Sequence, residues 1–340
     1  MKRIKLVAES HVPYIDALGA VADIRRLGPA EFTPESIAGA DALIVRTRTR
    51  CDAALLEGSD VRFVGTATIG TDHIDLDLCR RIGITVANAP GCNAPAVAQY
   101  VFASLAALAN RPLAGYAIGI VGVGHVGRIV ERWARSLGMK VMRCDPPRQR
   151  TEGGDDWFTL DDIARRADII TFHTPLTCDG EDATFHLGSR EFFASLRRAP
   201  IIINAARGPV VDNEAWADAL EAGVTGPAVI DCWEGDPAIF RRLLGLASIA
   251  TPHIAGYSAP GKMRATQMVA DAMTDCFGLP HVECAPCPVP DVPDAISQAD
   301  AAFGYDPMAD NRALRANPEA FESLRNNYAL RPELIPGKSF

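Results

Sequence analysis

The sequence lacks three features, and the absence of each disfavours a class of protein. No apolar run is long enough to cross a membrane, since residues 100–108 fall far short of the roughly 20 residues that a spanning helix needs. There is no excess of positive charge: the formal net charge is −8, whereas nucleic-acid binding needs a basic face. The first residues, MKRIKLVAES, show neither the apolar core nor the cleavage site of a signal peptide. We therefore expect a cytoplasmic protein whose partners include neither a membrane nor a nucleic acid.

A regular framework of cysteines is also missing. The nine cysteines are scattered, mostly in apolar contexts where a free thiol behaves as a small hydrophobic group. One spacing, H-x-x-C-x-x-C at His281, Cys284 and Cys287, offers three ligands for zinc but no fourth ligand with matching local spacing. The pair of cysteines also does not follow a strand and open a helix, as a redox pair does. We expect free thiols in a linker rich in proline, and no metal site.

The bulk composition is that of an ordinary globular chain. With 340 residues, of which 48% are hydrophobic and 22% charged, the chain is long enough for about two domains. Its first third alternates strand-like apolar runs with helical patterns near residues 13–18 and 53–57. Four strands are expected, at residues 4–8, 42–46, 62–66 and 84–87. Such alternation is typical of an α/β fold with a mostly parallel sheet.

A second alternating series follows a long apolar helix that is expected at residues 95–109. It contains six strand-like runs, the number in a full Rossmann sheet, at residues 117–121, 140–144, 169–173, 201–205, 228–231 and 248–250. Another helix, expected at residues 261–277, would return the chain to the first domain. We expect an α/β protein in which a Rossmann-type dinucleotide domain is inserted into a smaller flavodoxin-like substrate domain, with the active site between them.

The expected domain boundaries follow from these elements. Residues 1–94 and 262–280 would form the substrate domain, and residues 95–261 would form the dinucleotide domain. Beyond residue 280 the composition changes to a linker rich in proline, and the remainder is too short for a core of its own. We expect residues 281–340 to be an appendage, helical near residues 318–328, that docks on a partner subunit in a homodimer.

The segment IGIVGVGHVG at residues 118–127 predicts a dinucleotide site. A β-branched run ends at three glycines, Gly122, Gly124 and Gly127, which open a helix. Such a turn presents bare backbone N–H groups and the positive end of the helix to a pyrophosphate. The next strand-like run, KVMRCD, ends at Asp145, whose carboxylate suits the hydroxyl groups of an adenosine ribose. The combination favours NAD over NADP as the cofactor.

Candidates for the chemistry lie in loops that follow strands of the second series. Arg207 follows the run IIINAA and would hold a carboxylate with its forked guanidinium group. His253, in TPHIAGYS, would carry a proton to or from a hydroxyl group. Asp236 and Glu234, in DCWEGDP, are both candidates for the acidic partner of that histidine. These roles fit hydride transfer between NAD and a hydroxy acid.

Several phrases of the sequence occur together in one protein family. They include GTATIGTDH, NAPGCNAPAVAQYVF, GIVGVGHVGR, CDPPR, NAARGPVVD, DCWEGDP and PHIAGYS. With these phrases the chain resembles the D-isomer-specific 2-hydroxyacid dehydrogenases over most of residues 1–280. It is most similar to a branch that oxidises a small phosphorylated hydroxy acid with NAD, on the route to pyridoxal phosphate. The phrase FESLRNNYALRPE near the C-terminus resembles the appended dimerisation domain of that branch.

The resemblance also implies roles for individual residues. It makes His253 the proton donor, Arg207 the clamp for the carboxylate and Asp236 the partner of His253. It places the substrate at Thr47, Thr68 and Tyr257. Besides the three glycines, it places NAD at a further set of positions: Asp145, Thr174, Ala205, Ala206, Arg207, Asp231 and Gly256.

Two departures from that branch affect the prediction. The usual partner of the histidine is Glu, whereas Asp236 is shorter by one methylene group, and a displacement near 1 Å costs on the order of 100-fold in rate. The tail stops at Phe340 and is shorter than the usual appendage. Two other functions stay open: a dehydrogenase for another acid such as D-3-phosphoglycerate, and a non-catalytic protein that senses NAD.

The run VRTRTR supplies candidates for binding a substrate phosphate. In an extended segment, Arg46, Arg48 and Arg50 would share one face, opposite Thr47 and Thr49. A cluster of guanidinium groups suits a phosphate dianion. We therefore expect at least one of these arginines, with Arg46 and Arg48 as the main candidates, to bind the phosphate, and a solvated sheet edge is the alternative.

Overall fold

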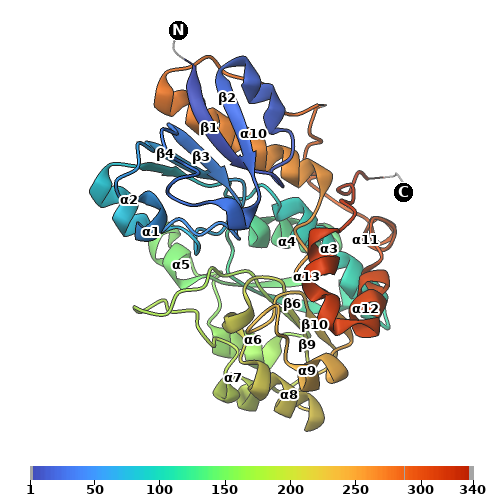
Figure 1. Cartoon of the computed structure of the whole chain (residues 1–340). Helices are drawn as coiled ribbons and strands as arrows, with labels where there is room; N and C mark the ends of the chain where they lie inside the picture. The colour runs from blue at the N-terminus through green and yellow to red at the C-terminus, as the bar shows by residue number, and fades with distance from the viewer. Residues whose placement is uncertain (1–2, 287, 337–340) are drawn as a thin grey trace. The chain divides into compact units, whose positions relative to one another are not determined.

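The computed structural model describes residues 3–286 and 288–336 (Figure 1). These residues form two compact units. Unit 1 comprises the described residues of 1–93 and 258–291, and unit 2 comprises the described residues of 94–257 and 292–340. In the described part of the chain, no helix is both long and apolar enough to span a membrane.

Unit 1 is built on a five-stranded parallel sheet. Its strands are β1 (Ile4–Glu9), β2 (Ala22–Leu27), β3 (Ala42–Val45), β4 (Phe63–Thr66) and β5 (Thr85–Ala87). Their spatial order, β2-β1-β3-β4-β5, is the flavodoxin-like order. The four strands expected in this region are all present. The sequence pattern does not predict β2, because this edge strand, ADIRRL, is largely accessible to solvent and has too few apolar residues to form a run.

Helices connect the strands of unit 1 and cover its sheet. The short ones are η1 (Ile15–Ala20), η2 (Pro29–Glu31), α1 (Ala53–Leu56) and α2 (Leu76–Ile82). The long helix α10 (Ala259–Phe277) packs on β4 and β5, where its Val269 and Met273 are buried in one core with Phe63 (Figure 1). It begins earlier than expected because the Ser258 hydroxyl accepts a hydrogen bond from the Gly261 N–H group, at 3.0 Å, and caps the first turn.

Unit 2 is built on a six-stranded parallel sheet. Its strands are β6 (Ala117–Val121), β7 (Lys140–Cys144), β8 (Ile169–Phe172), β9 (Ile201–Asn204), β10 (Ala228–Ile230) and β11 (Ile249–Ala250). Their spatial order is β11-β10-β9-β8-β6-β7, and a parallel bridge between Arg143 and Trp157 lies beyond β7. After β6 the chain adds β7 on one side of that strand and then β8 on the other side, so the order in which strands are added reverses between β6 and β8. Ligands bind at such a switch point in doubly wound sheets.

Helices lie on both faces of this second sheet. They are α3 (Ala94–Leu108), α4 (His125–Ser136), α5 (Pro146–Glu152), α6 (Leu160–Arg166), α7 (Arg190–Ser195), α8 (Asn213–Glu221) and α9 (Arg241–Leu246). Neighbouring residues of β8 enter opposite cores: Ile169 packs with Trp133, and Ile170 packs with Trp216. Strands that are buried on both faces read as continuous apolar runs, so the expected strands match the observed ones to within one residue at each end.

The C-terminal segment differs from the expected appendage. Its helices α11 (Gln298–Phe303), α12 (Pro307–Ala316), η5 (Pro318–Ala320) and α13 (Phe321–Asn326) pack within unit 2, where α11 and α12 contact α3 (Figure 1). Leu314 and Phe321 are buried in one core of the unit, and Ile296 and Leu334 in the other. Four widely spaced apolar residues cannot form a core of their own, but each packs into one of the two cores of unit 2.

The observed units also differ slightly from the expected domains. The chain passes from unit 1 to unit 2 at residues 93/94 and returns at 257/258, against expected boundaries at 94/95 and 261/262. The described residues of 281–291 belong to unit 1 and not to the appendage. There the N–H group of Cys284 donates to Oε1 of Gln267 in α10 at 2.7 Å, and the Cys284 side chain is buried in the unit 1 core.

Candidate active site

The glycine-rich loop of unit 2 joins β6 to α4 at the switch point of the sheet. Gly122 has φ +86°, and a Cβ atom there would lie 2.8 Å from the backbone that follows β8. A Cβ atom at Gly127 would lie 2.2 Å from the Gly122 carbonyl oxygen. At Gly124, which precedes α4, a Cβ atom would point into open space. The outer two glycines thus allow the tight turn and the close helix packing, while Gly124 leaves the loop surface bare.

This bare surface fits the pyrophosphate of NAD. The first N–H groups of α4 have no partner within the helix, and the positive end of the helix dipole faces the same space. Two polar atoms just after β8, Nδ1 of His173 and Oγ1 of Thr174, are buried without a hydrogen-bond partner among the described residues. Burial lowers the pKa of His173 to about 3, so its ring is neutral near pH 7. The loop and these atoms offer donors and acceptors but no negative charge that would repel a phosphate.

Asp145 directly follows β7 and lies beside the glycine loop, as the sequence predicts. One carboxylate oxygen accepts a hydrogen bond from the Val123 N–H group at 2.8 Å, and the other accepts from the Arg148 N–H group at 3.1 Å. The carboxylate therefore holds the glycine loop and caps α5, and each oxygen retains a second lone pair for a ribose hydroxyl. Arg148, which the sequence reasoning missed, donates to the Val123 carbonyl and pairs with Glu152.

The structure brings His253 and Asp236 together. Nδ1 of His253 lies 2.8 Å from Oδ2 of Asp236, and both side chains are partly buried. Burial would raise the pKa of the Asp236 carboxyl group, but its hydrogen bond with His253 and the charges of His253 and Arg325 lower it overall. The carboxylate is therefore ionised at neutral pH and holds the imidazole ring in one orientation.

Asp231 binds residues on both sides of His253. This carboxylate, at the end of β10, is fully buried. It accepts hydrogen bonds from the Thr251 hydroxyl group at 2.7 Å, the Ile254 N–H group at 2.8 Å and the Ala255 N–H group at 2.9 Å. The resemblance places NAD at Asp231, which stays a prediction; the role that the contacts give it is to shape the loop at residues 251–257, which we call the catalytic loop.

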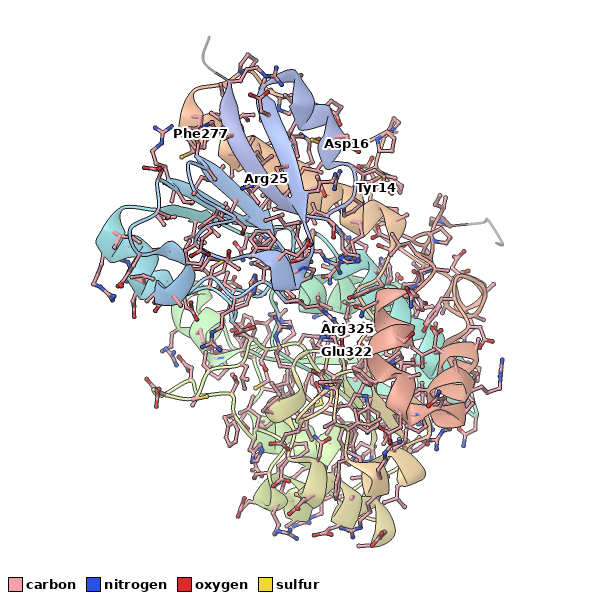
Figure 2. The ribbon with its side chains drawn as sticks, viewed as in Figure 1. Tyr14, Asp16, Arg25, Phe277, Glu322 and Arg325 are labelled. Atoms are coloured by element: carbon pink, nitrogen blue, oxygen red, sulfur yellow. The ribbon has the colours of Figure 1, made fainter. Side chains whose placement is uncertain are left out.

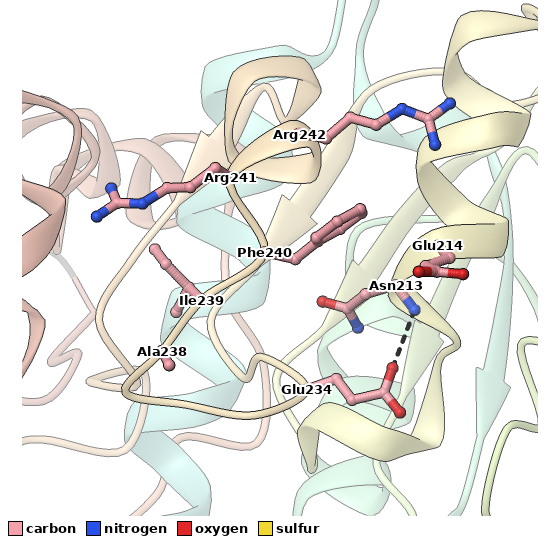
Figure 3. Close-up of a pocket in the computed structure, with 8 residues that line it drawn as sticks. All are labelled: Asn213, Glu214, Glu234, Ala238, Ile239, Phe240, Arg241 and Arg242. Carbon is pink, nitrogen blue, oxygen red and sulfur yellow. Dashed lines mark hydrogen bonds between the residues drawn. The ribbon is translucent and has the colours of Figure 1, made fainter.

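Glu234, the other candidate partner of His253, is engaged elsewhere. Its Oε1 lies 2.7 Å from Nε2 of His186. Its Oε2 accepts from the Asn213 N–H group at 3.2 Å (Figure 3). Glu234 also lines an open pocket of about 500 Å³, together with residues of α8 and α9 (Figure 3). Of the two carboxylates that the sequence offered as the partner of His253, the structure therefore pairs Asp236 with it.

Arg207 follows β9 and precedes the short helix η4 (Gly208–Val210), and its side chain is half-buried. Asn204, the last residue of β9, holds this turn: its Nδ2 donates to the carbonyls of Arg207 at 3.0 Å and Gly208 at 3.3 Å. Its Oδ1 accepts from the Ala206 N–H group at 3.2 Å. Asn204 was missed by the sequence reasoning, and its signal is a buried amide at the end of an otherwise apolar strand. Ala205 and Ala206 lie in the same turn.

Thr68, in unit 1, belongs to a polar cluster that follows β4. Its hydroxyl group lies 2.7 Å from that of Thr66 and donates to the Gly70 carbonyl at 3.2 Å. Nε2 of His73 lies 3.1 Å from the same Thr66 hydroxyl, and burial lowers the pKa of this histidine. Contact of Thr68 with a substrate stays a prediction.

The run VRTRTR is not extended, so the expected arginine face is wrong. β3 ends at Val45, and the Thr49 N–H group donates to the Arg46 carbonyl at 3.2 Å in a turn. The buried carboxylate of Glu9 causes this bend, because it accepts from both the Arg46 N–H group at 2.9 Å and the Thr49 hydroxyl at 2.8 Å. The Arg46 guanidinium reaches the His11 carbonyl at 3.3 Å. Thr47 and Arg48 are exposed in the turn.

The C-terminal segment reaches the catalytic loop, which the sequence reasoning did not anticipate. The buried Arg331 donates from its guanidinium group to the carbonyls of Ile254 at 3.1 Å and Tyr257 at 3.2 Å, and also to that of Ala255. These bonds hold the part of the loop that contains Gly256 and Tyr257. Only the pattern FESLRNNYALRPE pointed to this segment.

The H-x-x-C-x-x-C spacing forms no metal site within the described residues. Cys287 lies outside them. Nδ1 of His281 lies 2.9 Å from Asp271, and burial raises the pKa of the Cys284 thiol to about 11. Among the residues that the structure describes, no three His, Cys, Asp or Glu side chains are grouped as a metal ion would need.

Comparison with known proteins identifies the family. The model of the NAD-binding domain of D-isomer-specific 2-hydroxyacid dehydrogenases matches residues 93–255. An erythronate-4-phosphate dehydrogenase of Bacteroides thetaiotaomicron is 44% identical over 338 residues, which cover 97% of each chain. The chain belongs to the erythronate-4-phosphate dehydrogenase branch of this family. A further member, from Azotobacter vinelandii, is 43% identical and covers 97% of this chain and 93% of its own.

Solved structures of the wider family share the fold. The D-lactate dehydrogenase of Aquifex aeolicus, complexed with NAD and lactic acid, superimposes with a TM-score of 0.68 at 23% identity, covering 80% of this chain and 96% of its own. A D-2-hydroxyisocaproate dehydrogenase superimposes with a TM-score of 0.68 at 20% identity, covering 82% and 99%. The expected α/β fold with a Rossmann-type NAD domain is thereby confirmed, and NAD is the cofactor of this family domain.

Proposed function

We propose that the chain catalyses the NAD-dependent oxidation of 4-phospho-D-erythronate to 2-oxo-3-hydroxy-4-phosphobutanoate, on the route to pyridoxal phosphate. Similarity to erythronate-4-phosphate dehydrogenases over 97% of the chain supports this substrate. The observation that carries the reaction is the 2.8 Å contact between His253 and Asp236, in the same unit as the glycine loop. Removing a hydride from a carbon that bears a hydroxyl group needs such a paired base, whereas a protein that only senses NAD does not.

His253 moves the proton. Its hydrogen bond with Asp236 places the ring proton on Nδ1, which leaves the lone pair of Nε2 for the substrate. In oxidation, Nε2 takes the proton of the C2 hydroxyl group; in reduction it returns that proton. The Asp236 carboxylate stabilises the imidazolium ion that forms in between.

Other residues of unit 2 hold the two reactants. Arg207 binds the C1 carboxylate through parallel N–H···O bonds. Gly122, Gly124 and Gly127 hold the pyrophosphate of NAD, and Asp145 its ribose. Bound NAD supplies the nicotinamide ring that accepts the hydride from C2. Further contacts with NAD come from the remaining positions that the resemblance implies: Thr174, Ala205, Ala206, Asp231 and Gly256.

The rest of the substrate would be bound by polar side chains outside the catalytic pair. Thr47, Thr68 and Tyr257 take the positions that the resemblance assigns to the substrate. Arg46 or Arg48 binds the phosphate, which suits guanidinium groups. The Arg46 guanidinium group uses only some of its N–H groups to bind the His11 carbonyl, so the others can donate to a phosphate.

The formation of NADH, followed by its absorbance, tests the proposal. The purified protein is assayed with NAD and each of 4-phospho-D-erythronate, D-3-phosphoglycerate and D-lactate. We expect the highest kcat/KM with 4-phospho-D-erythronate. A higher value with D-3-phosphoglycerate would overturn the proposed substrate but not the chemistry, whereas NAD binding without turnover of any acid would overturn both.

The proposal includes a cytoplasmic location and a homodimer. The dimer is supported by the likeness of FESLRNNYALRPE to the dimerisation domain of the branch, although in this chain those residues pack on unit 2. Sedimentation equilibrium at micromolar concentration tests it. A mass near twice 36.4 kDa is expected, and the mass of a single chain would contradict the dimer.

A further inference from the structure

A second arginine of the C-terminal segment lies beside the catalytic loop. Arg325, in α13 (Figure 2), is half-buried. A hydrogen bond with the Tyr257 side chain helps to raise its pKa. Three residues further, the ring of Tyr328 packs edge-on against that of Tyr257, with centroids 6.0 Å apart. Arg331 then holds the Ile254 and Tyr257 carbonyls. These successive contacts fix α13 against the loop and Arg325 at its edge.

Arg325 carries a charge that the protein only partly neutralises. No ion pair among the described residues includes Arg325. The carboxylate whose charge acts on it is Asp236, which is already hydrogen-bonded with His253. Burial lowers the pKa of Arg325, but Tyr257 and Asp236 raise it overall, so the guanidinium group stays charged. A half-buried cation with spare donors is suited to an anionic ligand.

Arg325 and Arg207 both act on one buried group, the Cys232 thiol just after β10. Burial and Asp231 raise the pKa of the Cys232 thiol, while the charges of Arg207 and Arg325 both act to lower it. The thiol lies 3.5 Å from the Ala206 carbonyl, beside the turn that contains Arg207. The substrate of the proposed reaction also has two anionic groups, a carboxylate at one end and a phosphate at the other.

We propose that Arg325 binds the substrate phosphate and makes the enzyme selective for phosphorylated acids. The inference rests on the proposed function, in which Arg207 takes the carboxylate. The forked donors of a guanidinium group match the oxygens of a phosphate, and Tyr257 takes one of the positions that the resemblance assigns to the substrate. The predictions for Arg46 and Arg48 are separate, and substitutions of those arginines test them.

Two substitutions of Arg325 test the inference. Arg325→Gln removes the charge, and Arg325→Lys keeps the charge without the fork. For each variant, kcat/KM is measured with 4-phospho-D-erythronate and with D-erythronate. For Arg325→Gln we expect the ratio of the two values to fall about 10- to 100-fold, through a higher KM for the phosphorylated acid. Arg325→Lys should retain part of the ratio.

A matched control separates this effect from a general loss of charge. Arg312→Gln removes the same charge from an exposed position on α12, and both kcat/KM values should stay at the wild-type level. Equal losses with both acids in Arg325→Gln would show that Arg325 only supports Tyr257, and would overturn the inference. An unchanged ratio would overturn it too. If Arg325→Gln does not fold, Arg325→Lys decides, since a wild-type ratio there contradicts phosphate binding.

Calorimetric titration with inorganic phosphate distinguishes this inference from the proposed function. We expect wild-type protein to bind phosphate and Arg325→Gln to bind it at least 10-fold more weakly. If the wild type does not oxidise 4-phospho-D-erythronate, the proposed function fails, and this titration still tests Arg325. Equal binding of phosphate by the wild type and Arg325→Gln would contradict the site whatever the reaction is.

Discussion

The carboxylate of Asp236 contacts Nδ1 of His253 at 2.8 Å, although the two residues follow different strands of the sheet. The branch usually has the longer Glu at the position of Asp236. The shorter side chain reaches the ring because the loops after β10 and β11 are tied together: Trp233 donates to the Thr251 carbonyl at 3.0 Å. Asp236 therefore needs no help from Glu234 as the partner of His253.

Two substitutions of Asp236, one that removes the charge and one that lengthens the side chain, should both lower kcat. Asp236→Asn removes the charge that stabilises the imidazolium ion, and a loss of about 10²- to 10⁴-fold is expected. Asp236→Glu adds a methylene group where contact already exists, and the resulting displacement near 1 Å should cost about 100-fold. Steady-state assays of both variants with 4-phospho-D-erythronate check this. If Asp236→Glu is as fast as the wild type, the loops after β10 and β11 are not arranged for the shorter aspartate side chain.

Loss of the proton carrier should stop turnover but not cofactor binding. His253→Gln is expected to lower kcat by about 10²- to 10⁴-fold, because glutamine cannot accept the hydroxyl proton. The glycine loop is built from other residues, so the Kd for NAD should stay within a few-fold of the wild type, as quenching of tryptophan fluorescence would show. His281→Gln, at an exposed histidine of unit 1, is the control. Near-normal turnover by His253→Gln would refute its role.

Two glycines of the loop should respond differently to an added methyl group. Gly124→Ala places the methyl group in open space that the pyrophosphate needs, so KM for NAD should rise about 10-fold or more with a small loss of stability. Gly127→Ala places it 2.2 Å from the Gly122 carbonyl and should lower the free energy of unfolding by about 1–3 kcal/mol or more. Urea unfolding and NADH assays measure both quantities. The reverse pattern would contradict the assigned roles.

The sheets could be predicted from the sequence because their strands are buried on both faces. A run such as Ile169–Phe172 is apolar throughout and is recognised without knowing its neighbours. β2 has no such run, because it is an edge strand that exposes Arg25 and Arg26. The packing of the C-terminal segment within unit 2 could not be predicted for a related reason: its apolar residues pack into cores formed by distant parts of the chain, and spacing alone does not show that.

The site could be predicted where the residue type itself carries the chemistry. Arg207, Asp236 and His253 were named for a guanidinium group, a carboxylate and an imidazole at strand ends, and the structure pairs the latter two. Residues that act on backbone groups left no such signal. Asn204 and Arg331 hold turns through carbonyl oxygens, and any part of the chain supplies carbonyl oxygens, so only the fold shows which ones are near.

The buried ring of His173 should make stability depend on pH. Its pKa is lowered by burial from 6.5 to about 3, so between these values the unfolded chain binds a proton that the folded protein does not. The contribution of the neutral His173 ring to the free energy of unfolding is therefore complete above pH 6.5. It decreases as the pH falls toward 3, by on the order of 1 kcal/mol per pH unit. His173→Gln cannot titrate, and its unfolding free energy in urea should change less between pH 7.5 and 5. Equal changes in both proteins would contradict the effect.

The arginines that follow β3 should contribute to recognition of the phosphate even though they do not share one face. Arg46→Ala or Arg48→Ala is expected to raise KM for 4-phospho-D-erythronate about 10- to 100-fold while KM for D-erythronate changes little, because only the first acid offers a dianion to the guanidinium group. Arg50→Ala is the matched control, since Arg50 is exposed and lies 3.1 Å from the carboxylate of Asp52. If both the Arg46 and Arg48 variants discriminate between the two acids as the wild type does, neither arginine binds the phosphate, and the solvated edge becomes the correct interpretation of this run.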